Sequence, residues 1–283
     1  MKTKNNLSTP FLADVFLVVA CLFSLCCDRA NAYQRAEILE KAPNFRDLGG
    51  YTSGDDEKQT VWRKIFRSQA LASLNDSDVE KLRELGVKTV IDFRDDDEVR
   101  RAPSRLPDSV NVIRLPIGLG SSDSAQRQLQ RLLMSGQLDS VQGVRFMEDA
   151  NRRLVAEFAP QYKAFFAVLL QPESYPLVFH CTAGKDRTGF AAALLLSALK
   201  VEWNTVMEDY LLTNLYLKPQ ALMPQIPEQA LPAMRQIWGV QPSYLNEAKS
   251  EIEKRYGSID SYLQKELNIG EVERERLAGY LLE

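Results

Sequence analysis

Residues 177–199 read LVFHCTAGKDRTGFAAALLLSAL, and the fold class can be predicted from this segment. Its first four residues, Leu177 to His180, are mostly apolar and follow a proline, which predicts a short buried strand. Residues Phe190 to Leu199 are apolar on most faces, which predicts a helix buried in the core. The segment HCTAGKDRTG joins the two, so the sequence predicts a strand, a tight loop and a helix that starts near Arg187.

Elements of the same two kinds alternate along the rest of the chain. Val87 to Phe93 and Val110 to Leu115 are the other strand candidates. Helical patterns cover Asn75 to Leu85, Gln126 to Leu138, Val144 to Leu170 and most of the chain from Trp203 onward, with breaks at Pro219, Pro224, Pro227, Pro232 and Pro242. Alternating strands and helices predict an α/β sandwich with a mostly parallel central sheet flanked by helices. Extra helices are expected before the loop and at the C-terminus.

Three features of the loop predict an anion-binding site. Five residues separate Cys181 from Arg187, and the successive backbone N–H groups of such a loop can point inward as an anion nest. The helix that follows adds the free N–H groups and the positive dipole end of its N-terminus. Arg187 supplies a planar, permanently charged fork for two phosphoryl oxygens. We therefore assign phosphate binding to Arg187 together with Thr182, Ala183, Gly184, Lys185 and Thr188.

Cys181 stands at the end of the predicted strand and is the candidate nucleophile. The helix N-terminus and the nearby cations favour its thiolate, which is the reactive form. Attack of the thiolate on phosphorus would give a phosphocysteine that water then hydrolyses. Thr188 is placed to stabilise the leaving thiolate in that second step. His180 is expected to fix the loop by hydrogen bonding or to tune the ionisation of the thiol.

The leaving oxygen needs a proton, and two carboxylates are candidates for the general acid. Asp186 lies inside the loop and is the first choice. Asp149, 32 residues before Cys181, is the alternative, because a carboxylate on a separate loop can swing in. Lys185 also has two interpretations. It contacts a second phosphate or an acidic headgroup, or it is a solvated side chain.

Composition narrows the function further. The chain has 283 residues, a formal net charge of −3 and one histidine, His180. A charge so near zero gives no sign of a nucleic-acid partner. A single histidine excludes a histidine-based zinc site, and we expect neither a metal nor a cofactor.

The N-terminus predicts export. Lys2 and Lys4 precede a mostly apolar run over residues 11–27, and Ala30-Asn31-Ala32 fits a cleavage site. We expect residues 1–32 to be a signal peptide and residues 33–283 to be a periplasmic or secreted catalytic domain. The alternatives are an uncleaved membrane anchor and a lipoprotein modified at Cys21. Cleavage removes three of the four cysteines and leaves Cys181 without an intramolecular disulfide partner.

With these residues in place, the sequence resembles the cysteine-dependent protein-tyrosine phosphatases, and more narrowly the bacterial tyrosine/lipid phosphatase family. Further segments carry the resemblance: residues 44–50 (NFRDLGG), Phe66-Arg67-Ser68 with Leu71, residues 91–94 (IDFR), residues 209–214 (DYLLTN), and the tail around Tyr256-Gly257-Ser258. The match spans nearly the whole chain after the signal peptide, which implies one domain with a tyrosine-phosphatase-like fold.

The resemblance implies Cys181 as nucleophile, Arg187 as phosphate clamp and Asp186 as acid. It implies activity on phosphotyrosine, and in some members also on phosphoserine, phosphothreonine and phosphoinositides, the wider range being associated with the pair Lys185 and Asp186. It also implies a helical lid, which we place over residues 126–170. Outside the loop, supporting ion pairs or substrate contacts are predicted for Arg46, Asp47, Asp92 and Arg94, and core positions for Tyr210 and Tyr216.

Three functions remain open at this point. The first is a metal-independent phosphatase for phosphotyrosine in proteins, either restricted to that substrate or with wider protein and lipid specificity. The second is an inositol phosphate or phosphoinositide phosphatase, which Lys185 favours. The third is an inactive phosphate-binding module, against which the intact Cys181, Asp186 and Arg187 argue. A membrane is expected only as the place of a lipid substrate or through an uncleaved or lipidated N-terminus.

Overall fold

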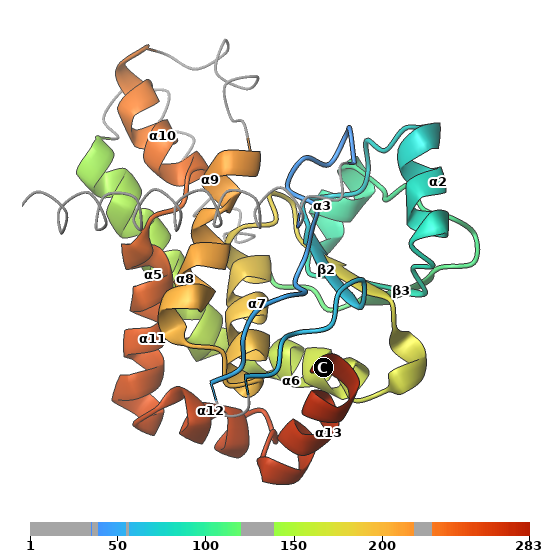
Figure 1. The fold of residues 1–283 in the computed structure, drawn as a ribbon. Coiled ribbons are helices and arrows are strands. Elements are labelled where there is room, and N and C mark those ends of the chain that lie inside the picture. Colours follow the sequence, from blue (N-terminus) through green and yellow to red (C-terminus); the bar gives the residue numbers. More distant parts are fainter. Residues whose placement is uncertain (1–34, 36–38, 55–56, 120–138, 218–227) are drawn as a thin grey trace, which may run out of the picture. The chain divides into compact units, whose positions relative to one another are not determined.

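The computed structural model describes residue 35 and residues 39–54, 57–119, 139–217 and 228–283 (Figure 1). The chain divides into two compact units, Met1–Ala36 and Glu37–Glu283, and every element below belongs to the second. The predicted signal peptide and the helix predicted over Gln126 to Leu138 lie outside the described residues. None of the helices in the described ranges is long and apolar enough to cross a bilayer.

A five-stranded sheet organises the second unit, in the order β1-β2-β5-β3-β4. Its strands are β1 (Arg46–Asp47), β2 (Ile65–Ser68), β3 (Thr89–Asp92), β4 (Asn111–Arg114) and β5 (Leu177–His180). Only the pair β1 and β2 is antiparallel, so the predicted mostly parallel sheet is confirmed. Strand β5 has the predicted bounds, and β3 and β4 are each shorter than predicted.

Side chains alternate between the two faces of the sheet, as the period of a strand requires. Phe66, Val90 and Val178 join the smaller core cluster, which includes Leu82 of α2 (Asp76–Glu84). Ile91 and Phe179 face the larger cluster, to which most other helices contribute. Figure 1 accordingly shows α2 on one side of the strands and the group around α7 on the other. The helices therefore flank both faces of the sheet, as predicted.

Most of the helices follow the sequence signals, but the helix at residues 96–101 was not predicted. Besides α2, the described α-helices longer than one residue are α3 (Asp96–Arg101), α5 (Ser140–Glu157), α6 (Ala159–Leu169), α7 (Asp186–Ala198), α8 (Trp203–Leu211), α9 (Thr213–Tyr216), α10 (Leu231–Trp238), α11 (Pro242–Tyr256), α12 (Ile259–Lys265) and α13 (Glu271–Leu281). Asn75 caps α2, and its side chain accepts from the backbone N–H of Asp78. The helix predicted over residues 144–170 is two helices, because Pro160 occupies the first turn of α6 and starts a new one.

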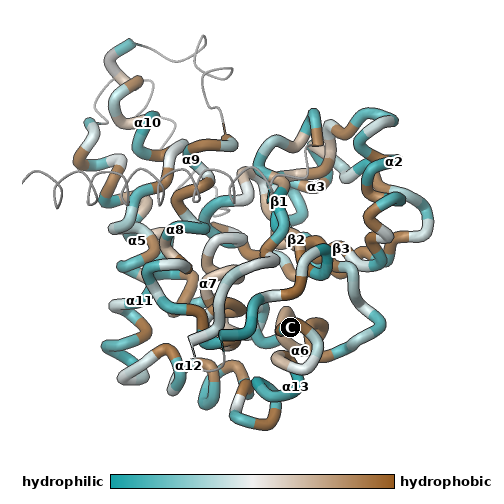
Figure 2. The backbone as a smooth tube through the Cα atoms, in the orientation of Figure 1, coloured by the Kyte–Doolittle hydropathy of each residue, from teal (hydrophilic) through white to brown (hydrophobic). Residues whose placement is uncertain are grey.

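Two prolines predicted as breaks also lie inside first turns. Pro232 lies at the start of α10 and Pro242 at the start of α11, where a missing N–H costs nothing. Along α11 hydrophilic and hydrophobic residues alternate (Figure 2), and its buried positions include Tyr244, Ala248 and Ile252. This spacing lets α11 pack on α5 through one face. Helix α7, in contrast, is buried along most of its length, as predicted.

Candidate active site

The candidate site lies where three parallel strands end. In the register of the sheet, Ser68 of β2 and Asp92 of β3 are both paired with His180 of β5. Cys181 follows directly and is only 2% exposed. Loops at the carboxyl edge of parallel strands meet at one place, which is the usual position of ligand sites in α/β folds. The sheet therefore brings the predicted loop to its own carboxyl edge, with α7 behind it.

The backbone of the loop is held from outside. Gly184 has φ +68°, and a Cβ there would stand 2.4 Å from the backbone oxygen of Ser68, so only glycine fits. Asn44 Nδ2 donates to the carbonyl oxygens of Ala183 and Gly184, at 2.9 and 3.2 Å. Arg67 Nη2 also donates to the Gly184 oxygen, at 2.8 Å. In a trans peptide the N–H points opposite to the C=O, so outward carbonyls turn the N–H groups that follow them toward the inside of the loop.

Arg187 lies in the first turn of α7 and is held by Glu98 of α3. Its Nη1 and Nη2 donate to the two carboxylate oxygens of Glu98, at 2.6 and 2.8 Å. Thr182 donates its hydroxyl to the same carboxylate. Burial alone would raise the pKa of Glu98, but the hydrogen bonds from Arg187 and Thr182 lower it to about 2. Burial likewise opposes the charge of Arg187, yet Glu98 raises the pKa of the guanidinium above its ordinary value.

This ion pair leaves one edge of the arginine fork for a ligand. Nη1 also contacts the carbonyl oxygens of Phe93 and Ile117, at 3.4 and 3.1 Å. Nε has no hydrogen-bond partner among the described residues. An arginine fixed on one side presents the remaining N–H groups in a defined direction. Sequence reasoning missed Glu98, although it lies only four residues after the quoted segment IDFR.

Asp186, the first candidate for the acid, is buried beside polar groups from two other helices. Its Oδ1 is 3.3 Å from both the Tyr210 hydroxyl of α8 and the Asn151 amide of α5. Tyr210 was predicted as a core residue, and it is buried, but its hydroxyl also donates to this carboxylate. Burial raises the pKa of Tyr210 well above its ordinary value, so it stays a donor at neutral pH.

The alternative acid, Asp149, is placed differently. It lies on α5 rather than on a loop, its side chain is 61% exposed, and it pairs with Arg152 at 3.0 Å. Asn151 of the same helix contacts Asp186. Residues two apart on a helix are separated by about 200° around its axis, so Asp149 faces away from the loop.

Lys185 is buried, so the interpretation as a solvated lysine is wrong. Its Nζ donates to the carbonyl oxygens of Ile237, in the last turn of α10, and of Gly239, just after that helix, at 2.5 and 2.9 Å. It also lies 3.3 Å from Asp186 Oδ2. The side chain is 8% exposed, and all three ammonium N–H groups have an acceptor within reach. Lys185 thus connects the loop to the C-terminal end of α10 through hydrogen bonds.

His180 and Thr188 lie within the buried base of the loop. His180 Nδ1 is 3.2 Å from the carbonyl oxygen of Cys181, and Nε2 is 3.8 Å from Asp92 Oδ1. Burial lowers the pKa of His180 to about 4, so the ring is neutral at pH 7. The hydroxyl of Thr188 is buried and has no hydrogen-bond partner among the described residues. The Thr188 hydroxyl can therefore donate a hydrogen bond to the Cys181 thiolate.

The four supporting residues divide into three arrangements. Asp92 and Arg94 pair with each other at 2.8 Å. Asp47 accepts from the backbone N–H groups of Gly49 and Arg63, so it holds a turn. Arg46 pairs with Asp209 of α8 at 3.0 Å. Asp209 was quoted only as part of the segment DYLLTN, and nothing in its local pattern indicated a buried carboxylate.

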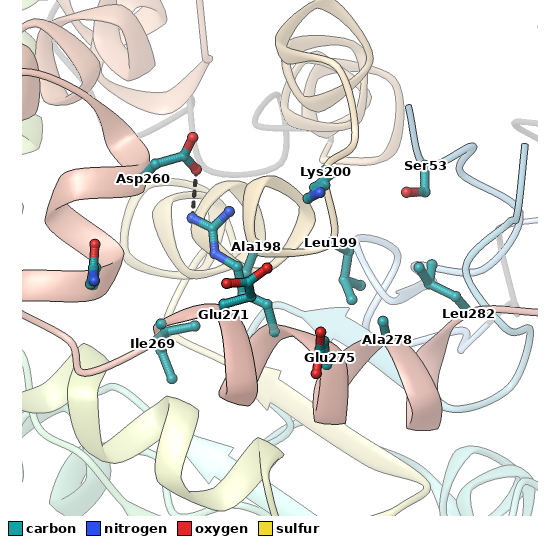
Figure 3. A pocket seen from close by; sticks show the side chains of 13 residues that line it. Ser53, Ala198, Leu199, Lys200, Asp260, Ile269, Glu271, Glu275, Ala278 and Leu282 are labelled. Carbon is teal, nitrogen blue, oxygen red and sulfur yellow. Dashed lines mark hydrogen bonds and ion pairs between the residues drawn. The ribbon is translucent and has the colours of Figure 1, made fainter. Parts of the chain in front are cut away.

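A separate cavity of about 490 Å³ lies beyond the C-terminal end of α7 (Figure 3). Its walls include Lys200, Glu275 and the ion pair of Arg274 with Asp260. None of the predicted site residues lines it. Because Asp186 and Arg187 lie at the other end of α7, this cavity is not the candidate active site.

A thiol, an anion-binding backbone and an arginine fork at one sheet edge are the features of a cysteine-dependent phosphatase. The chain belongs to the tyrosine phosphatase family, whose model matches residues 38–283. The predicted resemblance is therefore confirmed, and the protein is a phosphatase.

Two relatives by sequence agree with the family match. The triple specificity protein phosphatase PtpB of Mycobacterium tuberculosis is 30% identical over 284 residues, which cover 86% of this chain and 98% of PtpB. A tyrosine-protein phosphatase of Nostoc commune is 31% identical over 156 residues, 55% of this chain and 50% of that protein. Among solved structures, Pseudomonas aeruginosa TpbA in complex with pTyr matches with a TM-score of 0.31 and 17% identity, covering 71% of this chain and 96% of that one.

Proposed function

We propose that this phosphatase hydrolyses phosphate monoesters through a phosphocysteine formed on Cys181. The observation that carries the proposal is the convergence of three groups at the carboxyl edge of the sheet. These groups are the buried thiol, the loop N–H groups turned inward, and the Arg187 fork that Glu98 holds on one side. Such an arrangement binds a phosphoryl group with its phosphorus next to the sulfur.

In the proposed first step, the Cys181 thiolate attacks phosphorus and forms the S–P bond while the P–O bond to the leaving group breaks. Asp186 donates its proton to the departing oxygen, and Arg187 with the loop N–H groups binds the phosphoryl oxygens. In the second step, Asp186 takes a proton from water, which attacks phosphorus and releases the thiolate. The unpartnered hydroxyl of Thr188 would donate to that thiolate.

The proposed substrate class is phosphotyrosine in proteins, with a range that extends to phosphoserine, phosphothreonine and phosphoinositides. Support comes from the family match and from a relative that is named a triple specificity protein phosphatase. The second candidate is a phosphatase for inositol phosphates or phosphoinositides. The sequence pair Lys185 and Asp186 favours it, although Nζ of Lys185 is bonded to carbonyl oxygens.

A substrate panel with EDTA present tests the proposal. Wild type should release phosphate from a phosphotyrosine peptide, and Cys181→Ser should lose turnover yet still bind orthovanadate. Equal activity of the two proteins would overturn the mechanism. The ratio of kcat/KM for a phosphotyrosine peptide to that for an inositol polyphosphate decides between the two substrate classes. An inactive wild type that binds phosphate would leave the phosphate-binding module as the function.

We further propose that residues 1–32 are a signal peptide and that the catalytic domain acts outside the cytoplasm. The N-terminal charge pattern and the sequence Ala30-Asn31-Ala32 support this. The exact mass of the protein recovered from a secreting host tests it. A mature N-terminus at Tyr33 is expected. A retained leader would support an anchor instead, and a diacylglyceryl adduct would show lipidation at Cys21.

A further inference from the structure

A cluster of two arginines and one aspartate is buried behind the loop. Arg46, Arg67 and Asp209 come from β1, β2 and α8, and their side chains are 0%, 0% and 1% exposed. Asp209 accepts from Arg46 Nε at 3.0 Å and from Arg67 Nη1 at 2.5 Å. The Tyr51 hydroxyl also donates to it, at 2.9 Å. We call these three charged residues the Arg–Asp cluster.

The cluster contacts the loop through carbonyl oxygens on its outer side. Arg67 donates directly to Gly184, whose next peptide N–H belongs to Lys185. Arg46 acts one residue further away, because its Nη1 donates to Asn44 Oδ1 at 2.6 Å and Asn44 holds Ala183 and Gly184. A cation on the carbonyl side of a planar peptide polarises it and makes the opposite N–H a better donor to an anion.

The charge of the cluster does not sum to zero. Both arginines are cations, and Asp209 is the carboxylate that pairs with them among the described residues. Burial would raise the pKa of Asp209, but the two arginines hold it well below its ordinary range, so it is ionised. The cluster therefore carries one excess positive charge inside the protein.

Other cations of the site have their own carboxylates. Arg187 pairs with Glu98, and Arg94 pairs with Asp92. Lys185 lies 3.3 Å from Asp186 and pairs with it whenever that carboxyl group is ionised. A buried excess charge is costly unless an opposite charge compensates it, and buried ion-pair clusters rarely contribute net stability. The loop beside the Arg–Asp cluster is where the proposed mechanism places anions, namely the Cys181 thiolate and the bound phosphoryl group. These anions would compensate the excess positive charge of the cluster.

We propose that Arg46, Arg67 and Asp209 are positioning residues, which fix the loop carbonyls outward and supply the buried counter-charge for the Cys181 thiolate and the bound phosphoryl group. This inference rests on the proposed function, since it takes Cys181 as the nucleophile. If the cluster had only a structural role, loss of an arginine and loss of Asp209 would change the ionisation of Cys181 in the same direction. A counter-charge requires the ionisation of Cys181 to respond in opposite directions. Removing an arginine lowers the net charge of the cluster by one, whereas removing the negative charge of Asp209 raises it by one.

The test is a titration of the Cys181 thiolate by its ultraviolet absorbance, with Cys181→Ser as the baseline. Arg67→Met should move the midpoint of thiolate formation up by about one pH unit, a roughly tenfold loss of thiolate at a fixed pH below the midpoint. Asp209→Asn should move it down. The double variant, with the wild-type net charge restored, should lie between the two. Arg152→Met, which removes an exposed cation from α5, should leave it unchanged.

Midpoints that move in the same direction, or do not move, would overturn the proposal. If Asp209→Asn does not fold, Arg67→Lys replaces it. The lysine keeps the charge and loses the fork, so its midpoint should stay about one pH unit below that of Arg67→Met, and equal midpoints would refute the counter-charge. The titration needs no turnover, so an inactive wild type would disprove the proposed function without deciding this result.

Discussion

Glu98→Gln is the sharpest test of how the arginine fork is held. The substitution keeps the shape of the side chain and removes the charge that Arg187 meets at 2.6 and 2.8 Å. The pKa of Glu98 is lowered from 4.5 to about 2, which at about 1.4 kcal/mol per unit corresponds to roughly 3 kcal/mol. Because 20% of the side chain is exposed to solvent, we expect a smaller loss of about 2 kcal/mol in the free energy of unfolding at pH 7.

The pH dependence gives the prediction its sign. A carboxyl group whose pKa is lowered by folding contributes stability above its unfolded pKa, and this contribution is lost as the pH falls through the folded pKa. The difference between wild type and Glu98→Gln should therefore be constant above about pH 5 and shrink steadily toward pH 2. Urea unfolding at several pH values measures it. A difference that does not change with pH would refute the ion pair as its origin.

An exposed pair provides the matched control. Arg153 and Glu157 also form two hydrogen bonds, at 2.7 and 2.9 Å, but their side chains are 35% and 45% exposed. Water screens such a pair, so Glu157→Gln should cost less than about 1 kcal/mol. Equal losses for the two variants would mean that burial of the Glu98 pair has no energetic weight.

Three further substitutions, two of them paired with a comparison variant, separate the remaining roles. Asp186→Asn should lower kcat/KM about 10²-fold or more for a phosphate ester with a poor leaving group and much less for one with a good leaving group. Asp149→Asn should leave kcat/KM for both esters unchanged. The reverse result would make Asp149 the acid. Lys185→Met leaves two carbonyl oxygens without their donor and should lower the free energy of unfolding by about 1–3 kcal/mol, with an equal fall of kcat/KM on a phosphotyrosine peptide and on an inositol polyphosphate. A loss on the inositol polyphosphate alone would show that Lys185 selects the substrate. Gly184→Ala should abolish orthovanadate binding and lower the melting temperature well below that of Gly257→Ala, which has φ +87° but no atom within 4 Å of the added Cβ; similar melting temperatures would mean that the close approach at Gly184 is not required.

The elements that sequence predicts best are those whose own pattern is complete. Strand β5 and helix α7 are apolar over most of their length, and burial follows directly from that. Strand β2 escaped prediction because its last two residues, Arg67 and Ser68, are polar yet buried. Strand β1 has only two residues, Arg46 and Asp47, which is too short for any period to show.

The limits of local patterns also explain which site residues the sequence could not predict. Local spacing identifies Cys181, Arg187 and the glycines, because strand, loop and helix are contiguous. The partners of the loop come from segments far away in the chain. Asn44 lies 139 residues before Ala183, and Glu98 lies 89 residues before Arg187. Only the sheet order, which places β2 and β3 on the two sides of β5, brings them together.

The loop residues accordingly face two ways, and this division explains why distant segments belong to one functional unit. In the proposed mechanism, Cys181, Asp186, Arg187 and the inward N–H groups face the phosphoryl group. The carbonyls of Ala183 and Gly184, together with the side chain of Lys185, face the surrounding elements. The five-residue loop between β5 and α7 has too few contacts of its own to stay ordered around an anion-binding cavity. Its geometry must therefore be set by those outer partners, so a substitution in any of them is expected to change the chemistry at the thiol without touching the substrate.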